Sequence, residues 1–177
     1  MNIIKTKNLA FIDGQNLHLG TIEDGWKVDL DKFRIYLKDK YAVSDAYYFL
    51  GCKYQEHQDL YTNLNKAGFT IIFREHGRDQ LAKKKGNVDT DIVFEIMKNL
   101  IENKDFSKVI IVSGDGDYKK MIDYLIIKNR FEKILFPNKK YFSSLYHNLG
   151  SEFFDFIDNI KKSGIIPKNR GMKFYFS

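Results

Sequence analysis

Short apolar runs alternate along this chain with stretches of helical periodicity. Most of the runs are continuously apolar, which is typical of β-strands covered on both faces. These predicted strands are Leu9–Ile12, Ala46–Leu50, Thr70–Phe73, Val109–Val112 and Ile134–Phe136. The helical patterns lie at about Asp29–Lys40, Gln55–Ala67, Val88–Asn103, Asp117–Lys128 and Phe153–Lys162. The alternation predicts an α/β fold with a central, mainly parallel sheet.

Length and composition indicate one globular domain. A chain of 177 residues has room for one sizeable core, and no repeat or linker interrupts the pattern. Hydrophobic residues make up 44% and charged residues 29%, which excludes both a disordered chain and a membrane protein. We expect the domain to span residues 1–163. The tail, residues 164–177, has weak periodicity and no evident role.

The cysteine content and the N-terminus favour the cytoplasm. The single Cys52 cannot form an internal disulfide, and its place after the apolar run to Leu50 predicts a buried thiol. We expect no signal peptide, and no apolar run is long enough to cross a bilayer. We therefore expect a cytoplasmic protein that does not contact a membrane.

The balance of charge favours a polyanionic partner. Lysine and arginine number 29 against 23 aspartates and glutamates, a formal charge of +6. The lysines are spread widely, whereas several acids gather in short motifs. An acidic spot on a basic body is what metal-assisted cleavage of a phosphate backbone requires.

Two of these acids follow predicted strands. Asp13 ends the first run, and Asp115 comes shortly after the fourth. Each alone is equally well explained as a turn or helix-cap residue. Together they would bring like charges to the carboxyl edge of the sheet, where ligands bind in open α/β folds, and a cation commonly offsets such repulsion.

Asp89 gives the sharpest single signal. On a helical wheel it lies near the middle of an apolar arc, which comprises Val88, Ile92, Val93, Ile96, Met97 and Leu100. A carboxylate facing the core needs a metal, a charge or hydrogen bonds, although its place in the first turn offers the helix dipole as an alternative. We expect metal ligation. Asp91 falls on the solvent side, and Glu95 at the edge of the arc is either an outer ligand or a surface residue.

Three neighbouring residues have two interpretations each. Asp117 is a metal ligand or the N-cap of the next helix. Asn16 contacts a ligand or a metal-bound water, or else closes the turn after Gly14. Ser113 orients an acid by hydrogen bonding or stabilises its own turn.

Three ordered motifs carry a family resemblance. They are Phe11-Ile12-Asp13-Gly14-Gln15-Asn16-Leu17, Lys85-Gly86-Asn87-Val88-Asp89 and Val112-Ser113-Gly114-Asp115-Gly116-Asp117-Tyr118. From Asn8 to about Ile160 the chain resembles NYN-domain proteins of the LabA-like group, relatives of the PIN-domain nucleases.

The resemblance implies a three-layer α/β/α PIN-like fold, Mg²⁺ or Mn²⁺ as cofactor, and hydrolysis of RNA. It implies a catalytic metal site with supporting polar residues. The implied ligands are Asp13, Asp89, Asp115 and Asp117, with Glu95 as a fifth and with Asn16 and Ser113 in support. The sequence departs from the family pattern twice, because Asn87 is inserted before Val88 and Glu95 stands where an aspartate is common. A glutamate can still ligate through its longer arm.

Basic and aromatic residues near the acids are candidates for contact with RNA. The densest basic stretch lies just before Asp89 and comprises Arg74, Arg78, Lys83, Lys84 and Lys85. It guides phosphates or is a solvated loop, and both interpretations stay open. The single Trp26 is a candidate for stacking on a base, with packing as its alternative.

Other classes of protein fit less well. A haloacid-dehalogenase-type phosphatase would need an acid at Gln15, and a dinucleotide-binding turn would need further glycines after Gly14. The four histidines lack the spacing of a zinc site. The remaining alternative is a non-catalytic RNA-binding or regulatory module, which the retention of Asp13, Asp89 and Asp115 disfavours. The sequence leaves DNA as a second substrate and a homodimer open.

Overall fold

The structure is a computed structural model, of which residues 7–74, 88–102 and 105–157 are described. Six parallel strands form one sheet in the order β3-β2-β1-β4-β5-β6. The strands are β1 (Asn8–Asp13), β2 (Val43–Leu50), β3 (Thr70–Phe73), β4 (Val109–Val112), β5 (Phe131–Phe136) and β6 (Phe154–Phe156). The α-helices are α1 (Gly14–Glu23), α2 (Leu30–Tyr41), α3 (Gln58–Ala67), α4 (Asp89–Glu102) and α5 (Lys119–Ile127). Short 3₁₀ helices occur at Gln55–His57, Gly116–Tyr118, Ser144–Tyr146 and Ser151–Phe153.

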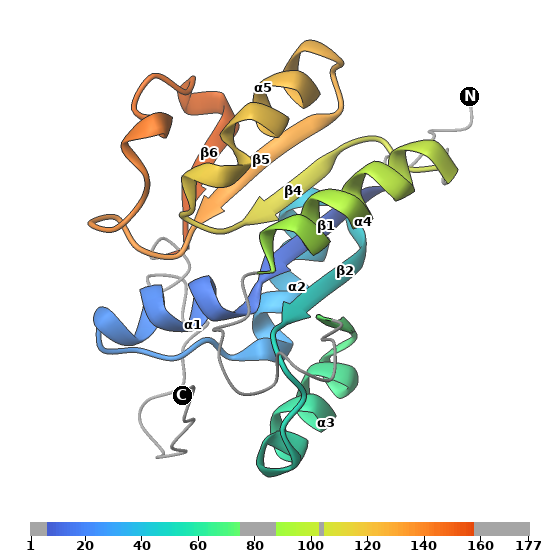
Figure 1. The fold of residues 1–177 in the computed structure, drawn as a ribbon, viewed down its shortest axis with the longest axis vertical. Helices are drawn as coiled ribbons and strands as arrows, with labels where there is room; N and C mark the ends of the chain where they lie inside the picture. The colour runs from blue at the N-terminus through green and yellow to red at the C-terminus, as the bar shows by residue number, and fades with distance from the viewer. Residues whose placement is uncertain (1–6, 75–87, 103–104, 158–177) are drawn as a thin grey trace, which may run out of the picture.

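Helices cover both faces of the sheet, which confirms the predicted three-layer α/β/α fold. In Figure 1, α4 and α5 cross in front of the sheet and α2 lies behind it. Ala10 and Ile12 of β1 pack with α1, α2 and α3, whereas Leu9 and Phe11 pack with α4 and α5. The two cores follow from the twofold alternation of side chains along one buried strand. All four residues of β4 are buried, as its continuous apolar sequence predicted.

The strands β2 and β5 begin earlier than their apolar runs do. β2 starts at Val43 and includes the polar Ser44 and Asp45. Its pairing with β3 begins only at Tyr47, so this first part of the strand bonds to β1 alone. A half-paired segment tolerates polar residues, and the hydrophobic pattern therefore missed it.

Two elements differ from the prediction altogether. Helix α1 was not expected, because Gly14 and Gly20 interrupt its pattern and Leu17 is its one fully buried large side chain. The stretch expected to be helical from Phe153 instead forms a 3₁₀ turn and then β6, which pairs with β5. A strand of three residues is too short to show a period of two. Residues 158–162 of that prediction, and the tail, lie outside the described residues.

The expectation of a buried Cys52 was wrong. Cys52 is half-buried rather than buried, since the chain has already left the sheet at Gly51. Among the described residues, no helix combines the length and the apolar character that crossing a bilayer requires. The boundary at residue 163 stays a prediction.

Candidate metal centre

The strand order places a switch point between β1 and β4. From β1 the sheet continues through β2 to β3, and from β4 it continues through β5 to β6 in the opposite direction. In open α/β sheets ligands bind beyond the carboxyl ends of the strands at such a point. Asp13 is the last residue of β1, and Asp115 follows β4 by three residues. The two strand ends predicted to carry acids are therefore neighbours.

Asp89, Asp115 and Asp117 form a compact cluster. Each contributes a carboxylate oxygen, and these oxygens all lie within 4.8 Å of one another. Asp89 opens α4 and is buried, Asp115 is half-buried before the 3₁₀ turn, and Asp117 within that turn is exposed. Mg²⁺ takes oxygen ligands, so these three carboxylates could hold one divalent ion. An all-oxygen donor set without His or Cys suits Mg²⁺ or Mn²⁺ better than Zn²⁺.

Asp13 lies beside this cluster. Its side chain is buried, and its Oδ1 accepts a hydrogen bond from the backbone N–H of Asn16 at 2.9 Å. Burial, with further contributions from the charges of Asp89 and Asp115, raises the pKa of Asp13 to about 6. Mutual repulsion among carboxylates is what a bound cation relieves. The residues present therefore fit a divalent metal.

A tyrosine from the end of the 3₁₀ turn holds Asp89 in place. The fully buried Tyr118 hydroxyl donates a hydrogen bond to Asp89 Oδ1. Burial and the nearby charge of Asp13 raise the pKa of Tyr118 far above its usual value, so the hydroxyl remains a donor. Such a bond fixes the orientation of a ligating carboxylate. Its position directly after Asp117 in the third motif was the signal that could have singled it out.

Tyr146 is a second residue that the sequence did not indicate. Its hydroxyl donates to the backbone carbonyl of Asp115 at 2.6 Å. This contact joins residues 31 positions apart, so no local sequence pattern predicts it.

The predicted supporting residues hold the loops around the acids. Asn16 Oδ1 accepts the N–H of Gly114 at 2.7 Å and so ties α1 to the loop after β4. Ser113 Oγ accepts the N–H of Asp115 at 3.1 Å. Asp115 Oδ1 in turn accepts the N–H of Asp117 at 3.0 Å, so Asp115 caps the turn as well as joining the cluster. The capping and metal-site interpretations of this segment are compatible.

Glu95 and Asp91 of α4 are not members of the cluster. Glu95 Oε1 accepts a hydrogen bond from Asn99 at 3.1 Å and lies 3.7 Å from Lys98 Nζ. The role of Glu95 as a ligand stays a prediction. Asp91 was expected to face solvent, but it is half-buried, and its Oδ2 has no hydrogen-bond partner within the described part of the chain. The first turn of α4 is thus covered more widely than its periodicity indicated.

The residues expected to touch RNA are mostly outside the described ranges, as Arg78 and Lys83, Lys84 and Lys85 are. Arg74 is half-buried, and its backbone N–H donates to the carbonyl of Leu50 at 3.0 Å, just beyond β3. Trp26 is only 7% exposed and packs in the core with α1, α2 and α3. Burial leaves its ring without an open face for a base, so packing is the role that the structure gives it.

Comparison with known proteins places the chain in a family. The model of the NYN domain matches residues 9–164. The chain belongs to the NYN domain family. This NYN domain is 27% identical, over 127 residues, to the "Low amplitude and bright protein LabA" of Synechococcus elongatus, a match that spans 67% of each chain. It also shares its fold with a protein of unknown function from Vibrio parahaemolyticus. That likeness has a TM-score of 0.72 at 20% identity and covers 90% of this chain and 97% of the other.

Membership confirms the resemblance that the three motifs indicated. The acids of this NYN domain lie where the switch point of its sheet offers a ligand site, and their number and chemistry suit a divalent cation.

Proposed function

We propose that this NYN domain is a metal-dependent ribonuclease, which hydrolyses the phosphodiester bonds of RNA. The observation that carries the proposal is the cluster of Asp89, Asp115 and Asp117 beside the buried Asp13. The family to which the chain belongs and its formal charge of +6 support a nucleic acid as substrate. Mg²⁺ or Mn²⁺ is the proposed cofactor.

The four aspartates would hold the metal, and no nucleophilic side chain is required. When bound, the metal supplies an activated water and stabilises the charge that develops on the phosphate. Tyr118 keeps Asp89 oriented, while Ser113 and Asn16 fix the loop that carries Asp115. Asp117 is the exposed member of the cluster and is therefore accessible to a substrate. Attack by water in line with the leaving 3′-oxygen would leave a 5′-phosphate and a 3′-hydroxyl.

A cleavage assay tests this function. End-labelled single-stranded RNA is incubated with Mn²⁺, Mg²⁺ or EDTA, with single-stranded DNA in parallel. We compare the unaltered chain with Asp115→Asn and with Asp39→Asn, a matched control that removes an exposed acid of α2. We expect cleavage only with metal. We also expect a loss of about 100-fold or more in Asp115→Asn, as when a group that stabilises a transition state is removed, and no loss in Asp39→Asn.

The alternative outcome has a definite meaning. If no RNA is cut with any metal while RNA is still bound, the chain is a non-catalytic RNA-binding module. Equal cleavage by Asp115→Asn and the unaltered chain would show that the activity does not arise at this cluster.

A further inference from the structure

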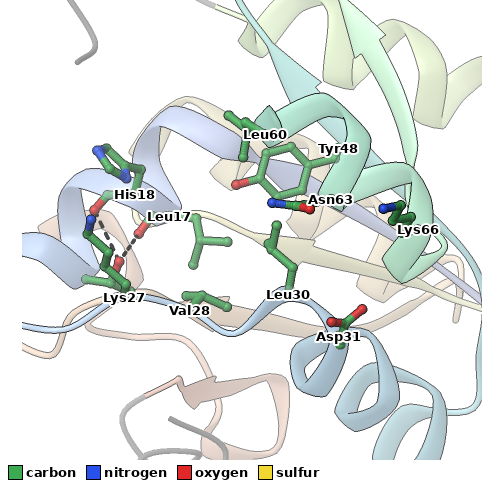
Figure 2. Close-up of a pocket in the computed structure, with 11 residues that line it drawn as sticks. Leu17, His18, Lys27, Val28, Leu30, Asp31, Tyr48, Leu60, Asn63 and Lys66 are labelled. Atoms are coloured by element: carbon green, nitrogen blue, oxygen red, sulfur yellow. Dashed lines mark hydrogen bonds between the residues drawn. The ribbon is translucent and has the colours of Figure 1, made fainter. Parts of the chain in front are cut away.

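A concave site lies on the opposite face of the sheet from α4. It is a cavity of about 360 Å³ between α1, α3, β2 and the segment that leads into α2 (Figure 2). This volume falls within the range of small-molecule sites, roughly 300–1,000 Å³. Its wall is apolar where Leu17, Val28, Leu30 and Leu60 contribute side chains, and polar side chains stand around this wall.

Tyr48 gives the cavity a hydroxyl that is open to a ligand. Tyr48 lines the cavity and is only 6% exposed, yet its hydroxyl makes no hydrogen bond to any of the described residues. Burial and the nearby charge of Asp13 raise the pKa of Tyr48 well above its usual value, so the group is a neutral donor and acceptor. A hydroxyl at a cavity wall that keeps its donor and its acceptor available can hydrogen-bond the edge of a bound base.

The polar residues of the cavity include a lysine at each end. Lys27 and Lys66 stand at opposite ends, and Asn63 of α3 lies between them on the same side as Lys66 (Figure 2). Asn63 carries both a donor and an acceptor, as recognition of the edge of a base requires. His18 is neutral at pH 7, because burial and the charge of Lys27 lower its pKa to about 4. The net charge of the cavity wall, with Asp31 included, is positive.

The cavity adjoins the metal centre. Leu17 and His18 lie about one turn along α1 from Asp13, which begins that helix as its N-cap. Tyr48 is close enough to Asp13 to sense its charge, and its ring packs directly against Gly14. A polymer bound at the acids could thus also reach the cavity.

We propose that this cavity binds one internal nucleotide of an RNA strand, with the base on the apolar wall beside Tyr48 and Asn63. Lys27 and Lys66 contact the phosphates on either side of that nucleotide. We choose an internal nucleotide over a free 5′-mononucleotide because the two lysines lie at opposite ends of the cavity. An internal nucleotide has a phosphate at each end, whereas a free 5′-mononucleotide has only one. This inference rests on the proposed function, because the RNA bound in the cavity would be the substrate that the acidic cluster cleaves.

Binding to the full chain in EDTA tests the proposal without any cleavage. The probes are adenosine and uridine 3′,5′-bisphosphates, the corresponding 5′-monophosphates and the free nucleosides. Calorimetry and the fluorescence of the single Trp26, next to Lys27, report binding. We expect the bisphosphates to bind about 10-fold more tightly than the monophosphates, the value of roughly one charged hydrogen bond. A short non-cleavable RNA should compete with them.

Substitutions locate the binding. Lys66→Ala should weaken bisphosphate binding about 10-fold, and Tyr48→Phe about 2- to 10-fold through loss of one hydrogen bond. Lys38→Ala, which removes an exposed lysine on α2, is the matched control and should bind as the unaltered chain does. Because Tyr48 is buried, Asn63→Ala on the exposed side of α3 serves as a second variant, with circular dichroism to verify the fold.

Three results would overturn the proposal. They are no binding of any probe, binding that Lys66→Ala and Asn63→Ala leave unchanged, and monophosphates that bind as tightly as bisphosphates without competition from RNA. The last result would identify a free mononucleotide as the ligand. Cleavage by the metal centre without binding here would refute this inference alone, and binding without cleavage would refute only the nuclease.

Discussion

Asp13 has two roles that conflict electrostatically. As the N-cap of α1 its carboxylate accepts the N–H of Asn16, and as a buried acid it lies near the charges of Asp89 and Asp115. Its pKa of about 6 in the folded chain exceeds the ordinary value of 3.8. The folded state therefore binds this proton more tightly than the unfolded state does. The contribution of Asp13 to the free energy of unfolding is therefore greatest below pH 4, and it is lost as the pH rises through about 6.

Asp13→Asn should accordingly stabilise the metal-free protein. Asparagine retains the capping oxygen and removes the charge. In EDTA at pH 8 we expect the melting temperature to rise by a few degrees, and at pH 4, where the aspartate is protonated, we expect no difference. Thermal denaturation across this pH range measures both. A variant that melts lower at pH 8 would show that the charge of Asp13 is well compensated without metal.

Single residues were predictable from sequence where one element determined their environment. The helical wheel of α4 identified Asp89 as a buried carboxylate, and the structure confirms this burial. The same wheel failed for Asp91, because what covers the first turn of α4 lies outside that helix. The third motif contains Tyr118 but does not reveal its bond to Asp89, and nothing local indicated Tyr146, since both hydrogen bonds join segments that meet only in the folded chain.

At the scale of elements, the turn between β1 and α1 is the most constrained. A Cβ placed on Gly14 would lie 2.7 Å from the carbonyl oxygen of Phe49 and would also overlap the ring of Tyr48. The first turn of α1 therefore packs directly on β2. This close approach positions Asp13 and Asn16 relative to the neighbouring strands.

Gly14→Ala should destabilise the fold by about 1–3 kcal/mol, the usual cost of overpacking. Because a backbone oxygen is involved, α1 must shift and Asn16 should lose its bond to Gly114. We expect both a lower melting temperature and weaker metal binding, measured by denaturation and by Mn²⁺ titration. Gly25→Ala is the comparison, since no atom lies within 4 Å of a Cβ there and only its positive φ opposes the change. If Gly14→Ala binds Mn²⁺ as tightly as the unaltered chain, the turn between β1 and α1 does not position the metal site.

The elements with long apolar or amphipathic patterns were predictable, and the short or interrupted ones were not. The runs of β1 and β4 and the amphipathic α3 follow directly from local sequence. α1 and β6 depend on partners instead, because α1 is fixed by its contacts with β2 and β6 by its pairing with β5. Tertiary contacts of this kind leave no local period.

For the molecule as a whole, metal binding should appear as thermal stability. A ligand that binds only the folded state stabilises it by about 2.7 kcal/mol at 100 times its Kd. Mn²⁺ should therefore raise the melting temperature by roughly 5–10 °C for a chain of this size. The rise should disappear in Asp115→Asn and persist in Asp39→Asn, as scanning calorimetry would show. An equal rise in all three proteins would place the metal elsewhere.

The order of assembly follows from the strand order. The N-terminal strands β1, β2 and β3 can pair with one another, but β4 must then dock on the free edge of β1. Asp13 meets Asp115 only at that step, across 102 residues of chain. Contacts so distant in sequence form late and slowly. A chain that lacks β4 therefore cannot assemble the acidic cluster, so the proposed nuclease would stay inert until β4 has joined the sheet.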